Sequence, residues 1–206
     1  MHEEQHEIEK KFYWDESRKQ ELHRNQQIKS KEFSDIYFDN VKHELTKRDW
    51  WLRRRGTAWQ LKIPSSPQVA AQAYREIETP EEIADYLGLP EITIQALQNA
   101  NIHPFITLHN KRESYKDQGL TISLDVVNNN FRYLRIGEIE KIVQTPQESQ
   151  QAVEDITRYA QQQGIDLLQP EPKKVAVFLK AGHYEELVQA NVIDPEAYKT
   201  NPLTEE

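Results

Sequence analysis

The chain has 206 residues, of which 37% are hydrophobic and 29% are charged, and its formal net charge at pH 7 is -8. This size and composition predict one domain over residues 1–206, with a frayed tail over 201–206. The sequence contains no cysteine, which excludes disulfides, iron–sulfur clusters and thiolate zinc sites. The acidic balance argues against a general nucleic-acid surface, because binding to a duplex is dominated by lysine and arginine.

No stretch of the sequence approaches the roughly 20 consecutive apolar residues that a membrane-spanning helix requires. The N-terminal segment MHEEQHEIEK has neither the basic start nor the apolar run of a signal peptide. We therefore expect a cytoplasmic protein that binds neither membranes nor nucleic acid. The sequence leaves the oligomeric state open.

Strand-like segments follow one another along the chain. The opening segment HEIEKKFYWD and residues 34–38, 50–55 and 58–63 have alternating or aromatic-rich patterns, broken by turn residues. Further strand-like runs are QAYREIE, FITLHNKRESYK, LTISLDVV, FRYLRIGEIEKIV and KVAVFLK. Eight or nine antiparallel candidates predict a β-barrel.

Two helices are predicted between these strands. Residues Thr79–Glu82 offer an N-cap, a proline at the first helical position and acids in the first turn, and Gly88 ends the helix. Thr145-Pro146 repeats this start, and helical spacing of apolar residues continues to Gly164. The fold class is therefore α+β, with helices flanking the barrel.

The opening segment carries acids and a base at every second position. Side chains in a strand alternate between faces, so Glu7, Glu9 and Lys11 share one face. Ile8 and Phe12 take the opposite face. A pattern of this kind also arises by accident on solvated surfaces, so its meaning depends on the other strands.

The same separation of faces recurs in later strands. It groups on the polar faces Trp51, Arg53, Arg55, Lys62, Thr121, Ser123, Asp125, Glu138 and Glu140. In an ordinary half-exposed sheet this face meets water. In a closed barrel the apolar face can instead turn outward beneath helices, here those at 80–100 and 146–163, while the charged face lines the interior.

A charged interior suits a particular kind of ligand. Buried charges persist when they are paired or bound to a ligand. Carboxylates bind Mg²⁺ or Mn²⁺, and arginine and lysine bind phosphate oxygens. The mixture of both signs therefore predicts a polyphosphate bridged to a divalent cation.

At these residues the chain resembles the CYTH superfamily, also called triphosphate tunnel metalloenzymes. Glu7-Ile8-Glu9-Lys10-Lys11 reads as the Glu-x-Glu-x-Lys signature of that family. The segments DIYFD, WWLRRR and WQLKIP are similar to the thiamine-triphosphatase branch, and AYREIE, NKRESYK, ISLDVV, IGEIE and KVAVFL continue the match in family order to about residue 180. The chain departs from the branch at Gln60 and over residues 13–31. The resemblance implies a closed eight-stranded antiparallel tunnel.

The resemblance also implies roles for individual residues. The substrate-binding residues would be Lys11, Arg53, Arg55, Lys62, Arg112 and Lys174, with Glu76 acting through a cation or water and Trp51 stacking on the organic group. The ligands of Mg²⁺ or Mn²⁺ would be Glu7, Glu9, Asp125, Glu138 and Glu140. Lys11, Arg55 and Lys62 would act on the transferring phosphoryl group.

Several functions are compatible with these residues. The first is metal-dependent hydrolysis of thiamine triphosphate to the diphosphate and phosphate. The second is hydrolysis of inorganic tripolyphosphate with little use of Trp51. The third is nonenzymatic binding of polyphosphate or a nucleotide, and adenylate cyclase activity ranks below these.

Overall fold

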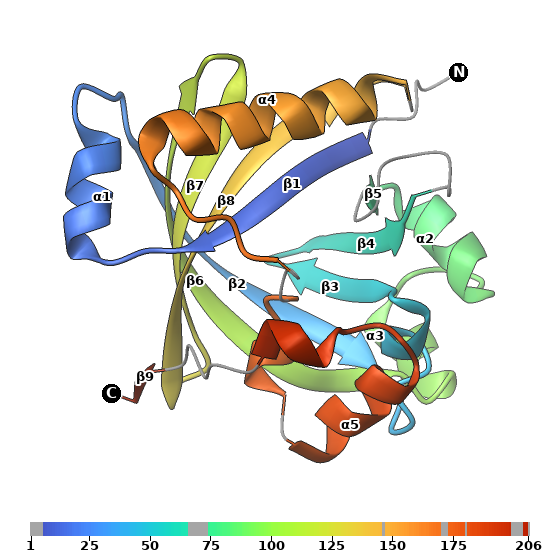
Figure 1. Cartoon of the computed structure of the whole chain (residues 1–206). Coiled ribbons are helices and arrows are strands. Elements are labelled where there is room, and N and C mark those ends of the chain that lie inside the picture. Colours follow the sequence, from blue (N-terminus) through green and yellow to red (C-terminus); the bar gives the residue numbers. More distant parts are fainter. Residues whose placement is uncertain are drawn as a thin grey trace.

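Eight antiparallel strands form the closed barrel of this protein, whose computed structural model describes residues 6–65, 74–145, 147–169, 173–179, 181–198 and 204–205 (Figure 1). The strands are β1 (His6–Tyr13), β2 (Lys29–Asp39), β3 (Trp51–Arg55), β4 (Ala58–Pro64), β5 (Tyr74–Ile77), β6 (His103–Asp117), β7 (Leu120–Asn128) and β8 (Arg132–Val143). Their order around the barrel is β1-β5-β4-β3-β2-β6-β7-β8, and pairing of β1 with β8 closes the ring. The predicted eight-stranded antiparallel barrel is confirmed.

The strands agree with the predicted segments except at the start of β2, which begins at Lys29 and not at residue 34, and near the C-terminus. The segment KVAVFLK was predicted as a strand, and this prediction is wrong, because Ala176–Phe178 form a short 3-10 helix, η2. A two-residue strand, β9 (Thr204–Glu205), pairs with Arg132 and Tyr133 at the start of β8. Residues 201–203 and 206 lie outside the described residues, so the prediction of a frayed tail stays untested.

In the described ranges, five α-helices and two further short 3-10 helices connect the strands. They are α1 (Glu16–His23), α2 (Pro80–Leu87), α3 (Ile94–Asn99), α4 (Glu148–Gln163), α5 (Ala181–Gln189), η1 (Thr46–Arg48) and η3 (Pro195–Tyr198). As predicted, α2 has proline in its first turn and ends at Gly88, whose φ of 66° is the left-handed conformation that glycine adopts readily. The α4 helix begins at Glu148, and its predicted start at Pro146 lies outside the described residues. Among the described helices, none is long and apolar enough to cross a membrane.

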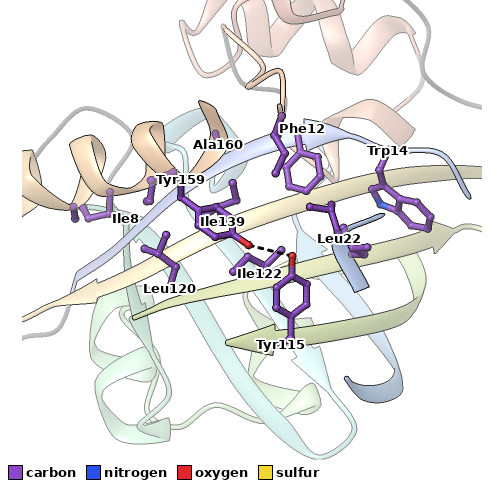
Figure 2. Packing of buried hydrophobic residues seen from close by; sticks show 14 of the residues in the cluster. Ile8, Phe12, Trp14, Leu22, Tyr115, Leu120, Ile122, Ile139, Tyr159 and Ala160 are labelled. Atoms are coloured by element: carbon purple, nitrogen blue, oxygen red, sulfur yellow. Dashed lines mark hydrogen bonds between the residues drawn. The ribbon is translucent and has the colours of Figure 1, made fainter. Parts of the chain in front are cut away.

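Two apolar cores cover the outer face of the barrel. The larger core lies between α4 and strands β1, β7 and β8, where Ile8, Phe12, Ile139 and Tyr159 are buried (Figure 2). The second core packs beneath α2 and α3, around Leu52, Leu61, Ile77, Ile83 and Leu97. The apolar face of each strand therefore turns outward under helices, as the alternation of the sequence predicts.

A third apolar cluster fills one end of the barrel interior. Leu134 and Ile136 share the inward face of β8 with Glu138, and Leu108 shares the inward face of β6 with Arg112. These side chains pack against the C-terminal segment, including Val175, Phe178 and Leu187. The interior is thus apolar at the end that the C-terminal segment covers, and charged in the remainder.

Candidate active site

The charged part of the interior encloses two adjoining chambers. The inner chamber, of about 100 Å³, is lined by Trp51, Tyr74 and Val175 among others and lies next to the apolar end of the barrel. The outer chamber, of about 470 Å³, is lined by residues that include Phe33, Arg55 and Glu140. The walls shared by both chambers are formed by Glu9, Tyr37, Arg53, Lys62, Glu138 and Lys174.

Two lysines pair with the acids of the opening strand. Lys11 Nζ lies 2.5 Å from Glu9 Oε1, and both side chains are less than a tenth exposed. Lys62 Nζ, on β4, lies 2.8 Å from Glu7 Oε2 and 3.4 Å from Glu9 Oε2. The Glu-x-Glu-x-Lys pattern therefore faces the tunnel interior and joins β1 to β4 across the chambers.

A second ion-pair cluster joins β6, β7 and β8 to the C-terminal segment. Arg112 donates from Nε and Nη2 to the two oxygens of Asp125, both at 2.6 Å, and its Nη2 lies 2.7 Å from Glu138 Oε2. Lys174 Nζ lies 2.6 Å from Asp125 Oδ2 and 2.9 Å from Glu138 Oε1. Two cations and two carboxylates thus satisfy one another within the barrel.

The two inward-facing arginines of β3 share Asp35, which the sequence had not singled out. Arg55 donates two hydrogen bonds to Asp35, at 2.7 and 2.8 Å. Arg53 lies 3.6 Å from Asp35 and 3.3 Å from Glu76, and its Nε donates to Gln60 at 2.9 Å. Gln60 is the position where the chain departs from the thiamine-triphosphatase branch, and its side chain therefore still contacts Arg53, a predicted phosphate-binding residue.

Asp49 organises the inner chamber. Its carboxylate accepts hydrogen bonds from Trp51 Nε1 at 2.6 Å, from the Tyr74 hydroxyl at 2.7 Å and from Lys173 Nζ at 2.9 Å. Its φ of 59° lies in the left-handed region, which aspartate tolerates better than most residues. Trp51 is only 6% exposed, so one acid fixes both a buried aromatic wall and a lysine of the C-terminal segment.

The acids differ strongly in protonation because their neighbours differ. Burial and the adjacent carboxylate of Glu9 raise the pKa of Glu7 to about 8, although Lys62 opposes this shift. Burial alone would raise the pKa of Glu9, but Lys11 and Lys62 outweigh it and bring the pKa to about 2. Burial, Glu138 and Glu9 raise the pKa of Glu140, which forms no ion pair within the described part of the chain.

The structure brings the predicted site residues together. Twelve of the thirteen line the two chambers: Glu7, Glu9, Lys11, Trp51, Arg53, Arg55, Lys62, Glu76, Arg112, Glu138, Glu140 and Lys174. The thirteenth, Asp125, is fully buried behind Arg112 and Lys174. Sequence reasoning missed Asp35, Tyr37, Asp49, Tyr74 and Lys173. Asp35 and Tyr37 occupy alternate positions of the quoted segment DIYFD, and that alternation is a signal that could have found them.

The interior acids offer the oxygen ligands that a divalent cation prefers, but they are not gathered into a ready-made metal site. In the described ranges, no group of three or more histidine, aspartate or glutamate side chains is close enough to hold a metal ion. Glu9 and Glu140 are nonetheless direct partners in the β1–β8 pairing, and burial together with nearby carboxylates raises the pKa values of Glu7 and Glu140. A cation would relieve this repulsion, so the donor set fits a hard divalent ion.

The fold and the site define a closed tunnel barrel whose interior carries paired charges. The chain belongs to the CYTH domain family, whose family model matches residues 5–174. A comparison with curated proteins finds no match.

Several solved structures are similar in fold. A protein from Pyrococcus horikoshii is 23% identical, with a TM-score of 0.57, over 78% of this chain and 92% of that chain. A proposed adenylate cyclase from Bacillus halodurans is 18% identical, with a TM-score of 0.57, over 84% of this chain and 97% of that chain. A proposed adenylyl cyclase from Hippeastrum, described as having a dominant triphosphatase activity, is 18% identical, with a TM-score of 0.55, over 84% and 94% of the two chains.

Proposed function

We propose that this chain hydrolyses a triphosphate bound in the charged interior of its barrel. The observation that carries the proposal is the set of lysines and arginines that face the two chambers, each held by a carboxylate. Outside an enclosed ligand site, so many partly buried charges of both signs would be costly to maintain. The CYTH family assignment and the activity described for the Hippeastrum protein point to the same reaction.

Binding is proposed to occur by exchange of partners. Phosphate oxygens would take the place of the carboxylates on the guanidinium and ammonium groups, because both kinds of anion accept the same charge-assisted hydrogen bonds. The residues that would bind the triphosphate are Lys11, Arg53, Arg55, Lys62, Arg112 and Lys174. Glu76, 3.3 Å from Arg53, would orient that arginine or hold a bound water. Before the substrate binds, the carboxylates of the protein pair with these lysines and arginines.

The carboxylates released by this exchange are proposed to hold Mg²⁺ or Mn²⁺. The ligands would be Glu7, Glu9, Glu138 and Glu140, which line the chambers. Asp125 is also a predicted ligand, but its burial suits it better to fixing Arg112 and Lys174. When bound, the ion would neutralise phosphate charge and orient the reacting oxygens.

The side chains of the barrel would supply the remaining stabilisation. Phosphoryl transfer needs mainly positioning and neutralisation of charge on the transferring group. Lys11, Lys62 and Arg55 are proposed to donate hydrogen bonds to the equatorial oxygens of that group. They remain charged during the reaction, so they require no proton transfer of their own.

We infer that the organic triphosphate is thiamine triphosphate, following the similarity of WWLRRR and WQLKIP to that branch of the family. Trp51 lines the inner chamber with Tyr37 and Tyr74, and an indole face is a favourable partner for a cationic thiazolium. Inorganic tripolyphosphate is the second candidate. The observation that favours it is the burial of Trp51 in a chamber of only about 100 Å³, which leaves little room for an organic ring.

Release of phosphate from thiamine triphosphate, tripolyphosphate and ATP, each with and without Mg²⁺, tests this proposal. Hydrolysis that requires Mg²⁺ supports the reaction class, and the ratio of kcat/KM values identifies the substrate. Trp51→Phe should reduce kcat/KM for thiamine triphosphate more than for tripolyphosphate if the indole binds the organic group. Equal losses would favour the inorganic substrate.

Controls separate this activity from the alternatives. Lys62→Met should remove activity, whereas Lys111→Gln, on an exposed outward-facing position of β6, should preserve it. Binding of triphosphates without any turnover would support a nonenzymatic binding protein. Production of cyclic AMP from ATP would identify a cyclase and overturn the proposed hydrolysis.

A further inference from the structure

Lys31 lies at the mouth of the outer chamber without a role in the site described above. The inward face of β2 carries Lys31, Phe33, Asp35 and Tyr37 at alternate positions. The last three line the outer chamber, and Lys31 follows one alternate position nearer the start of the strand. Lys31 is exposed and pairs in register with Arg112 of β6. It therefore continues the cationic wall of the tunnel toward solvent.

Phe33 holds three cations at this mouth. The guanidinium carbon of Arg55 lies 3.9 Å from the centre of the Phe33 ring, Lys31 Nζ lies 5.1 Å from it, and the guanidinium carbon of Arg112 lies 5.9 Å from it. All three distances are within the range of cation–π attraction. The ring thus brings three like charges close to one another at this end of the outer chamber.

Lys31 differs from the other cations in its partners. Arg55 is held by Asp35, and Arg112 is held by Asp125 and Glu138. Lys31 forms no ion pair with any residue that the structure describes. Partial burial of its side chain and the nearby charges of Arg112 and Arg55 lower the pKa of Lys31. An anion at this position would supply the acidic partner that Lys31 lacks among the described residues.

We propose that Lys31 binds a fourth phosphoryl group, so that the mouth of the tunnel accepts linear polyphosphates longer than the triphosphate. This inference rests on the proposed function, because it assumes that three phosphoryl groups occupy the chambers. The ligand class follows from the residues present, because three cations around an aromatic ring offer hydrogen-bond donors to phosphate oxygens. The terminal phosphate of the chain projects toward solvent beside Lys31.

Titration calorimetry without divalent ions, with tripolyphosphate and with tetrapolyphosphate, tests this proposal on the full chain. The wild-type protein should bind tetrapolyphosphate about tenfold more tightly than tripolyphosphate, as expected for one added charge-assisted contact. Lys31→Gln should remove this difference and leave the affinity for tripolyphosphate within about threefold of wild type. Lys111→Gln makes the same charge change on the outward face of the adjacent strand, and it should preserve the difference.

Four results would overturn the proposal. Equal effects of Lys31→Gln and Lys111→Gln would show only a general effect of charge. Equal loss of both ligands in Lys31→Gln would place Lys31 in the triphosphate site itself. If the wild-type protein hydrolyses triphosphates but gains no affinity from the fourth phosphoryl group, this inference fails while the proposed function stands. If it neither binds nor hydrolyses any polyphosphate, both fail.

Discussion

Removal of the Arg112 guanidinium should destabilise the metal-free protein strongly. Arg112 makes three hydrogen bonds of 2.6 to 2.7 Å to Asp125 and Glu138, and Asp125 is fully buried. Arg112→Met preserves much of the side-chain length but leaves two carboxylates to share the single ammonium of Lys174, which lies 2.6 and 2.9 Å from them. The two carboxylates therefore lose only part of their pairing, because Lys174 continues to contact both of them.

The size of the loss follows from these contacts. Breaking a buried ion pair by removing one partner costs about 3 to 5 kcal/mol, and the remaining pairing with Lys174 favours the lower end of this range. We expect the free energy of unfolding to fall by about 3 kcal/mol, measured by urea denaturation with linear extrapolation. Since the pair is partly shielded from solvent, the loss should depend little on salt concentration.

Arg54→Met is the matched control for this measurement. Arg54 lies on the opposite face of its strand from Arg53 and Arg55, and its guanidinium carbon lies 5.7 Å from the centre of the Trp59 ring. Loss of one cation–π contact predicts a decrease of at most about 1 kcal/mol. Similar losses in Arg112→Met and Arg54→Met would refute the reasoning, because they would show that the interior ion pairs are no more sheltered than the outer surface.

Three further predictions concern stability. An added Cβ at Gly137 would overlap the ring of Phe12, so Gly137→Ala should reduce the free energy of unfolding by about 1 to 3 kcal/mol. Phe12→Leu combined with Gly137→Ala should restore part of the lost stability. If the losses of the two substitutions simply add, the prediction is contradicted. Burial raises the pKa of Glu7 in the folded chain to about 8, against an ordinary value of 4.5. The metal-free protein should therefore become less stable by about 1 to 3 kcal/mol as the pH rises from about 5 to about 9, and Glu7→Gln should flatten this pH profile in urea denaturation. An unchanged profile in the variant would exclude Glu7 as its source. Asp49→Asn keeps the left-handed backbone but removes the charge facing Lys173. We expect the free energy of unfolding to fall by about 1 to 3 kcal/mol in the same assay. An unchanged free energy of unfolding would show that Asp49 does not organise the inner chamber.

The two faces of the barrel strands could be predicted from the sequence because strand alternation is a local property. Glu9 and Lys11 share one face whichever strands become their neighbours, and Ile8 and Phe12 share the other. The cover helices were also readable, because Gly88 and Gly164 mark their ends with left-handed backbone. Strand alternation identified nine of the twelve predicted residues that line the chambers, whereas Glu76, Arg112 and Lys174 were predicted from the family resemblance alone.

Features that depend on tertiary contacts could not be read in this way. The run KVAVFLK has a composition typical of strands, but a short apolar run is ambiguous between a buried strand and a buried helix. Its residues Val175–Phe178 form or adjoin a 3-10 helix because they pack against the apolar end of the barrel interior. The role of Asp49 was also hidden, since its three partners come from β3, β5 and the C-terminal segment.

The central claim is that a phosphate chain replaces the interior carboxylates as the partner of the tunnel cations. A crystal structure of the protein with tripolyphosphate and Mg²⁺ tests this claim most directly. The account predicts phosphate oxygens within hydrogen-bonding distance of Arg53, Lys62 and Arg112, with Glu7 or Glu9 released from Lys62. Tripolyphosphate bound outside the barrel, with every interior ion pair intact, would contradict the account.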